Sequence, residues 1–170
     1  MYTVSLNNGV KQYMKFSAII LTPISKGAII PPSNFEFPRV FSELEPISSH
    51  REVNINANRN KLQEIYRTMY FSDYHAVLLM DSDVVATNDQ LLKLIENYKD
   101  GCTACLRTKP TETDHVIGAC CLLNGSDYLK IDYLNDSNVC QCLKLPNPFY
   151  IDGEKATETR YDRTALYGKR

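Results

Sequence analysis

The sequence lacks long apolar runs, runs of a single charge and internal repeats. Its longest apolar stretches, such as residues 76–80, are far shorter than the ~20 apolar residues that a membrane-spanning helix needs. Its 19 basic and 20 acidic residues are scattered along the chain, which argues against a basic surface for nucleic acid. The first residues do not show the basic and apolar segments of a secretory signal. We therefore expect a cytoplasmic protein that neither spans a membrane nor binds nucleic acid.

The length and composition favour one domain. A chain of 170 residues, of which 44% are hydrophobic, can bury one substantial core. We expect this domain over residues 15–170, preceded by a loose polar arm over residues 1–14. Six cysteines form three close pairs, which are Cys102 with Cys105, Cys120 with Cys121, and Cys140 with Cys142. We interpret them as free thiols that pack as small hydrophobic residues, and a zinc site built from the first and last pairs is the alternative.

The hydrophobic pattern predicts strands alternating with helices. Strands are expected at residues 15–21, 76–80, 102–107 and 116–123, and the first of these should end at Thr22-Pro23. One helix should be capped by Asn56 or Asn58 and continue to about residue 70, and a second should start after Thr87. Residues 25–49 read as a loop with one short strand at most. This alternation predicts an α/β fold with a mostly parallel central sheet flanked by helices, and with ligands bound at the carboxyl ends of the strands.

Two carboxylates, Asp81 and Asp83, come directly after the apolar run at residues 76–80. Ionisable groups at the end of a buried strand are unfavourable without a partner, which makes a bound cation plausible. Mg²⁺ and Mn²⁺ take oxygen ligands and are commonly completed by phosphate oxygens of a nucleotide. A divalent ion on a diphosphate also stabilises the charge that develops as the diphosphate leaves. The pattern therefore indicates a metal and diphosphate site.

A longer stretch around this motif resembles the nucleotide-binding half of the GT-A glycosyltransferases, especially the family-2 type. The similar features are an Arg-Asn helix start at Arg59-Asn60, a strand closing in Asp81-Ser82-Asp83, and a following helix that opens with Asp89 and leucines. The resemblance covers residues 56–107 and extends weakly to residues 15–23 and 116–129. It implies a GT-A-like, Rossmann-like domain in which residues 15–107 bind metal and nucleotide sugar and residues 108–170 form the acceptor part. The expected partners are a nucleoside diphosphate sugar and an acceptor that is a glycan, a protein or a small molecule.

The resemblance also implies roles for single residues. Asp83 would be the main ligand of Mn²⁺ or Mg²⁺, and Asp81 would reach the ribose, or the metal through water. Ser82 belongs to the same donor site, Arg59 would contact the base or the diphosphate, and Thr22 and Pro23 would border the nucleoside pocket. Residues 118–120 (Gly-Ala-Cys) would line the acceptor side.

The catalytic base that takes the proton of the acceptor hydroxyl has three candidates. Asp152, near Glu154, lies well after the metal motif, as the base of inverting family members does. Asp114 and His115 are the rivals, because they precede a strand that should approach the donor sugar. Inversion and retention therefore stay open.

Two other functions fit parts of the same pattern. Residues 78–85 also satisfy the first motif of haloacid-dehalogenase-type phosphatases, in which Asp81 would be the nucleophile. Their remaining roles would fall to Thr103, Lys130, and Asp132 with Asp136. The third possibility is a non-catalytic protein of the same fold that binds sugar nucleotides.

Overall fold

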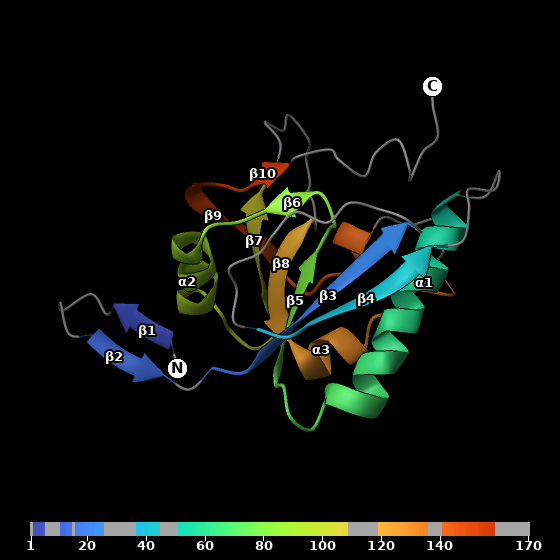
Figure 1. Ribbon diagram of the computed structural model, residues 1–170, viewed down its shortest axis with the longest axis horizontal. Coiled ribbons are helices and arrows are strands. Elements are labelled where there is room, and N and C mark those ends of the chain that lie inside the picture. The colour runs from blue at the N-terminus through green and yellow to red at the C-terminus, as the bar shows by residue number, and fades with distance from the viewer. Residues whose placement is uncertain are drawn as a thin grey trace.

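A six-stranded sheet with helices on both faces forms the centre of the protein (Figure 1). The computed structural model describes residues 2–5, 11–14, 16–25, 37–44, 51–108, 119–135 and 141–158. The strand order is β4-β3-β5-β8-β7-β9. These strands are β3 (Ala18–Ser25), β4 (Arg39–Leu44), β5 (Ala76–Met80), β7 (Thr103–Arg107), β8 (Cys120–Asn124) and β9 (Pro148–Lys155). In this sheet only β8 runs antiparallel to its neighbours, which confirms the prediction of a mixed α/β domain with a mostly parallel sheet.

The sheet carries one hydrophobic core on each face. Helix α1 (Arg51–Ile65), the following π-helical turn η1 (Tyr66–Tyr70) and α3 (Gly125–Leu129) lie on the side that we call the α1 face, where Leu62 and Tyr66 pack on Leu79. Helix α2 (Asn88–Glu96) covers the other side, the α2 face, where Leu94 packs with Leu78. All five residues of β5 are buried, as expected for an apolar run without alternation. In the described part of the chain, no helix combines the length and apolarity that crossing a membrane requires.

Strand β3 does not stop at Thr22-Pro23, as the sequence suggested, but continues to Ser25. The proline is tolerated because of where the neighbouring strand ends. Strand β5 pairs with β3 only as far as Leu21 opposite Leu79, whereas β4 continues to pair through Pro23 opposite Ser42. The missing N–H of Pro23 therefore removes no bond from the β3–β5 ladder.

Helix α1 begins at Arg51, earlier than predicted, so that neither Asn56 nor Asn58 is its N-cap. Both side chains are buried inside the helix instead. The amide of Asn58 donates a 2.9 Å hydrogen bond to the backbone oxygen of Ser42 in β4, and the Ser42 hydroxyl donates to the Asn58 side-chain oxygen. Asn58 thus anchors the helix to the sheet, a tertiary role that the capping pattern does not distinguish from a helix start.

Helix α2 follows the predicted start signal. The Thr87 hydroxyl accepts a hydrogen bond from the backbone N–H of Gln90, and the Gln90 side chain accepts one from the N–H of Thr87. This reciprocal capping box satisfies two backbone donors at the start of the helix. The amide of Gln90 also donates to the backbone oxygen of Lys155, which ties α2 to the end of β9.

The C-terminal part of the described chain crosses the carboxyl edge of the sheet. Strand β9 pairs with β7, and a bulge interrupts the ladder between Cys105 and Arg107. The chain then continues into β10 (Thr157–Glu158), which pairs with β6 (Val84–Val85), the strand directly after the Asp81-Ser82-Asp83 triplet. Residues far apart in the sequence are thereby joined at the candidate site (Figure 1).

The N-terminal residues contain two strands where a loose arm was expected. Strands β1 (Tyr2–Ser5) and β2 (Lys11–Met14) pair antiparallel with each other, outside the six-stranded sheet (Figure 1). Apolar and polar residues alternate from Tyr2 to Ser5, and the sequence between the strands includes Asn8-Gly9, a dipeptide typical of hairpin connections. The segment was interpreted as irregular because its overall polarity obscured these signals.

Candidate functional site

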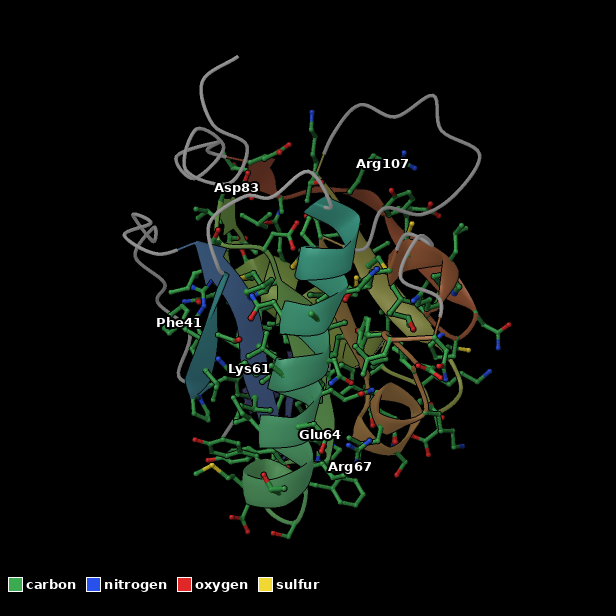
Figure 2. All side chains as sticks on the ribbon, turned by 90° about the vertical axis from the view of Figure 1, so that its right-hand side faces the viewer. Phe41, Lys61, Glu64, Arg67, Asp83 and Arg107 are labelled. Carbon is green, nitrogen blue, oxygen red and sulfur yellow. The ribbon has the colours of Figure 1, made fainter. Side chains whose placement is uncertain are left out.

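The triplet Asp81-Ser82-Asp83 forms a tight turn where β5 ends, as predicted. The backbone N–H of Asp81 donates to the oxygen of Ala119 at 2.9 Å, and the N–H of Val84 donates to the oxygen of Asp81 at 3.2 Å. Ser82 and Asp83 are 2% and 8% exposed, and Asp81 is half-buried. Figure 2 shows Asp83 at one edge of the sheet, with Glu64 and Arg67 at the opposite end of the molecule. The turn therefore holds two carboxylates close to the carboxyl ends of the parallel strands.

A pocket lies beside this turn on the α1 face. It is narrow: its cavity volume is about 10 Å³, room for roughly one water molecule, inside a depression of about 260 Å³ that is partly open to solvent. The ends of β3 and β5, one side of α1 and the segment after β8 supply its walls, which are formed by Leu21, Pro23, Arg59, Leu62, Leu79, Met80, Asp81, Tyr128, Tyr133 and Gln141. The structure thus brings together Pro23, Arg59 and Asp81, three of the residues predicted to form the donor site. Asp83 is not part of this wall.

Arg59 carries an unsatisfied donor in the pocket wall. Its Nε is buried and has no hydrogen-bond partner among the residues that the structure describes, and its Nη1 makes a long contact of 3.5 Å with the side-chain oxygen of Asn56. A buried donor without an acceptor costs about 1–3 kcal/mol. A ligand that presents an acceptor oxygen to this guanidinium would remove that cost, so the pocket suits a polar or anionic ligand.

Tyr128, Tyr133 and Gln141 complete the pocket wall, and no local sequence pattern indicated them. Burial raises the pKa of the Tyr128 and Tyr133 hydroxyls, and the positive charge of Arg59 opposes that rise. The Tyr133 hydroxyl donates a 2.9 Å hydrogen bond to the side-chain oxygen of Gln141, which fixes the orientation of both. Because Tyr128 belongs to α3 and Gln141 to a short 3₁₀ turn, only the tertiary fold places them beside Arg59.

Thr22 does not border this pocket, contrary to the prediction. Alternate side chains of a strand point to opposite faces, and Leu21 and Pro23 already face the pocket. Thr22 therefore lies on the α2 face, where it is fully buried and its hydroxyl accepts a 2.9 Å hydrogen bond from Nε of Arg39. Arg39 is a polar residue at this sheet edge that was not predicted from the sequence.

Of the predicted base candidates, the structure describes Asp152. It is exposed on β9, within the bulged stretch that faces Arg107 of β7, and does not belong to the pocket wall. Its neighbour Glu154 is ion-paired with Lys93 of α2, and the hydrogen bond from that lysine lowers the pKa of the Glu154 carboxyl. Glu154 thus has a structural partner. Asp114 and His115 lie outside the described residues.

The stretch expected to line the acceptor side is buried where the structure describes it. Ala119 is buried, and Cys120 is fully buried in the core of the α2 face, where burial strongly raises the pKa of its thiol. Cys120 therefore acts as a core residue and does not line an acceptor surface, because the antiparallel strand β8 continues the sheet between β5 and β7. Gly118 lies outside the described residues.

No cluster of three or more histidine, cysteine, aspartate or glutamate side chains close enough to hold a metal ion occurs among the described residues. Cys102, Cys105, Cys120, Cys121 and Cys142 are free thiols. The described cysteines therefore form no zinc site, and Cys140 lies outside the described part of the chain. A metal at Asp81 and Asp83 would take its further ligands from water or from a bound phosphate.

The residues proposed to assist Asp81 in a phosphatase do not gather at the triplet. Thr103 of β7 is aligned with Val77 of β5 across the sheet. Asp81 comes four residues after Val77 and therefore lies roughly 13 Å from the level of Thr103 along the strand direction. The Thr103 hydroxyl instead donates to the oxygen of Pro146. Lys130 is ion-paired with Asp127, and Asp132 accepts hydrogen bonds from the backbone of the residues that follow it. Asp136 lies outside the described residues.

No family model and no curated protein sequence matches this chain. Among solved structures, a similar chain is described as the crystal structure of A197 from STIV. The two align with a TM-score of 0.49 and 13% sequence identity, over 83% of this chain and 84% of that chain. At this level of similarity the alignment identifies neither a family nor an activity.

Proposed function

We propose that this protein is a metal-dependent glycosyltransferase that moves a sugar from a nucleoside diphosphate sugar to an acceptor hydroxyl. The observation that supports it best is the pocket at the ends of β3 and β5, where Pro23, Arg59 and Asp81 meet. These three residues come from separate parts of the sequence and were each expected at a nucleotide-sugar site. The walls are apolar and aromatic with a few polar groups, and the unsatisfied Nε of Arg59 suits a phosphate or base oxygen. Because the cavity has room for about one water molecule, binding of a nucleoside requires these walls to move apart.

The triplet fits a divalent cation of the Mg²⁺ or Mn²⁺ type. Asp83 is its principal ligand in this proposal, and Asp81, which belongs to the pocket wall, reaches the ribose or the cation through water. Two carboxylates leave coordination positions for water and for phosphate oxygens, as such ions prefer. When bound, the cation supplies positive charge to the leaving diphosphate.

The proposed reaction is a single group transfer. The acceptor hydroxyl oxygen forms a bond to the anomeric carbon, the bond from that carbon to the diphosphate breaks, and the nucleoside diphosphate leaves with the bonding electrons. The hydroxyl proton passes to a base, for which Asp152 is the described candidate because it is an exposed carboxylate near the carboxyl edge of the sheet. Arg59, in the pocket wall, binds and orients the donor.

A thermal-shift panel tests the proposal. UDP-, GDP-, ADP- and CMP-sugars are added with Mn²⁺ and with a chelator, and at least one nucleoside diphosphate sugar should raise the melting temperature only with Mn²⁺. Slow release of nucleoside diphosphate from that donor then separates a transferase from a non-catalytic binding protein. Hydrolysis of p-nitrophenyl phosphate without any effect of the sugar nucleotides would favour the phosphatase instead.

A further inference from the structure

Arg39 is held in a fixed position on the α2 face of the sheet. It is the first residue of β4 and pairs with Ile20 of β3. Its Nε donates a 2.9 Å hydrogen bond to the hydroxyl of Thr22, and its guanidinium carbon lies 5.2 Å from the ring centroid of Phe41. The guanidinium therefore extends along β3 toward the end of that strand, and its side-chain ordering is already achieved before any ligand binds.

This guanidinium also has an unsatisfied donor. The Nη2 atom of Arg39 is buried and has no hydrogen-bond partner, and among the described residues no carboxylate lies within ion-pair distance of it. Burial lowers the pKa of the Arg39 side chain, yet an arginine remains charged at neutral pH. A partly buried cation without an anion is unfavourable for the folded state.

The location connects Arg39 to the donor pocket. Thr22, which holds Arg39, directly precedes Pro23, which belongs to the pocket wall on the α1 face. Strand β5 has stopped pairing with β3 at this level, so the end of β3 is flanked by Arg39 on one face and by Arg59 on the other. Both arginines present a buried donor atom without a partner.

We propose that Arg39, positioned by Thr22, binds a phosphate oxyanion at the end of β3 on the α2 face. The planar guanidinium matches the oxygens of a phosphate, and no described residue provides an acceptor for the Nη2 donor. Two kinds of ligand carry such an oxyanion: the diphosphate of the sugar donor, and free phosphate or pyrophosphate. Binding of the donor's diphosphate rests on the proposed function, whereas the oxyanion site itself does not.

Isothermal titration with inorganic pyrophosphate in the presence of a chelator tests the site without a metal. The wild type should bind pyrophosphate, and Arg39→Met should weaken the affinity by about 10- to 100-fold, because a charge-assisted hydrogen bond is lost. Arg67→Met is the matched control: it removes one charge from an exposed arginine paired with Glu64 at the end of the molecule away from Asp83 (Figure 2), and it should bind as the wild type does. Without ligand, Arg39→Met should melt at the same or a higher temperature.

The proposal is overturned if the wild type does not bind pyrophosphate, if Arg39→Met binds it as tightly, or if both variants weaken binding equally. Should Arg39→Met fail to fold by circular dichroism, Arg39→Lys replaces it. Lysine keeps the charge but loses the guanidinium fork, so an affinity at least about threefold weaker is expected, and an unchanged affinity contradicts the proposal.

A second titration with a nucleoside and its diphosphate identifies the source. If Arg39→Met weakens the binding of the nucleoside diphosphate but not that of the nucleoside, Arg39 binds the donor's diphosphate. If Arg39→Met weakens the binding of pyrophosphate but not that of the nucleoside diphosphate, the natural ligand is free phosphate or pyrophosphate. Pyrophosphate binding that depends on Arg39, in a protein that neither binds nor hydrolyses any sugar nucleotide, would refute the proposed function and leave the oxyanion site intact.

Discussion

At the scale of single residues, the candidate site depends on which face of the sheet each side chain occupies. Asp81 and Arg59 share a pocket on the α1 face, whereas Thr22 and Arg39 meet on the α2 face. The two faces come together at the end of β3, because β5 stops earlier and its chain turns into the triplet. A ligand at this edge can therefore contact charged groups from both sides.

Replacing Asp152 with Asn tests the described candidate for the catalytic base. The exposed carboxylate is removed with little change of shape, so donor affinity should stay the same while the rate of sugar transfer or donor hydrolysis falls by about 10²- to 10⁴-fold. Steady-state release of nucleoside diphosphate measures the rate, and titration with the donor measures the affinity. Lys155→Met, an exposed neighbour, serves as the control. An unchanged rate in Asp152→Asn would assign the proton transfer to another group.

Tyr66 and Gly125 form a tight contact that supports the α1 face. The Tyr66 hydroxyl donates a 2.7 Å hydrogen bond to the oxygen of Tyr74, and a methyl group added at Gly125 would lie 1.9 Å from that hydroxyl. Because Tyr66 is fully buried, the ring cannot swing away. Gly125→Ala should therefore lower the free energy of unfolding by about 1–3 kcal/mol, as overpacking does.

A double-mutant cycle isolates this contact. Tyr66→Phe alone should cost about 0.5–1.5 kcal/mol by removing the hydrogen bond. In the double variant the clash with the hydroxyl oxygen is gone. Its loss of stability should therefore be smaller than the sum of the losses in the two single variants. Chemical denaturation of the four proteins measures the coupling. Strict additivity would mean that Gly125 is needed for a reason other than the Tyr66 hydroxyl.

The sequence predicted part of the site for a physical reason. Asp81 and Asp83 follow a buried run that ends in carboxylates, which is a local pattern. Pro23 and Arg59 were expected only from the family resemblance, and Arg59 lies inside α1 and not at its start. Thr22 was expected to border the same pocket as Pro23, but successive side chains of β3 point to opposite faces, so only Pro23 does. Tyr133, Gln141 and Arg39 had no local signal, since their roles arise only from contacts between distant segments.

At the scale of elements, strand β5, which precedes the triplet, and helix α2, which follows it, together fix its position. Strand β5 is buried on both faces and ends at Met80, and α2 begins shortly after β6 with its capping box. Helix α2 in turn fixes the end of β9 through Gln90 and through the ion pair of Lys93 with Glu154. The stretch that carries Asp152 is therefore connected to the helix that follows the triplet.

Removing the helix cap tests how far α2 depends on it. Thr87→Ala loses the hydroxyl that accepts the N–H of Gln90 and should lower the free energy of unfolding by about 1 kcal/mol. For a chain of this size, the melting temperature should fall by roughly 2–4 °C. Asn88→Ala, an exposed residue in the first turn, is the matched control and should change little. Equal stability of Thr87→Ala and the wild type would show that tertiary packing alone holds the start of α2.

The elements that the sequence predicted well are those with a strong local pattern. The prediction for β5 was confirmed at both ends, and the capping box marked the start of α2. Strands β9 and β10 were missed, because their pairing with β7 and β6 joins segments far apart in the chain. The start of α1 was placed too late, since Asn56 and Asn58 looked like caps but are buried in the helix.

At the scale of the whole molecule, the sheet separates two cores, and the core of the α1 face is rich in tyrosine. Burial raises the pKa of Tyr66 from 10.0 to about 12, and it also raises the pKa values of Tyr128 and Tyr133. Tyr66 packs on Tyr128, and Tyr128 packs on Tyr133, with ring centroids 5.6 Å and 6.5 Å apart. These hydroxyls stay protonated in the folded protein at a pH where exposed tyrosines ionise.

Alkaline pH should therefore destabilise the protein. Below pH 10 the hydroxyls are protonated in both states, so the raised pKa values have no effect on stability. Between pH 10 and about 12 the unfolded chain releases the Tyr66 proton first, and the free energy of unfolding falls as pH rises. Melting temperatures by circular dichroism, with tyrosine absorbance recorded in parallel, measure the effect. Tyr133→Phe should show a smaller loss, and a wild-type stability that is flat across this window would contradict the burial of these hydroxyls.

The most direct test of the proposed function is calorimetric titration of UDP-, GDP-, ADP- and CMP-sugars into the wild type and Asp83→Ala in the presence of Mn²⁺. Asp73→Ala, which removes an exposed carboxylate from the turn before β5, at the opposite end of that strand from the triplet, is the control. We predict that the wild type and Asp73→Ala bind one nucleoside diphosphate sugar with the same affinity and lose most of it with a chelator, whereas Asp83→Ala binds at least about tenfold more weakly. Equal affinity of Asp83→Ala and the wild type in Mn²⁺, or binding of no donor by the wild type, would contradict the assignment.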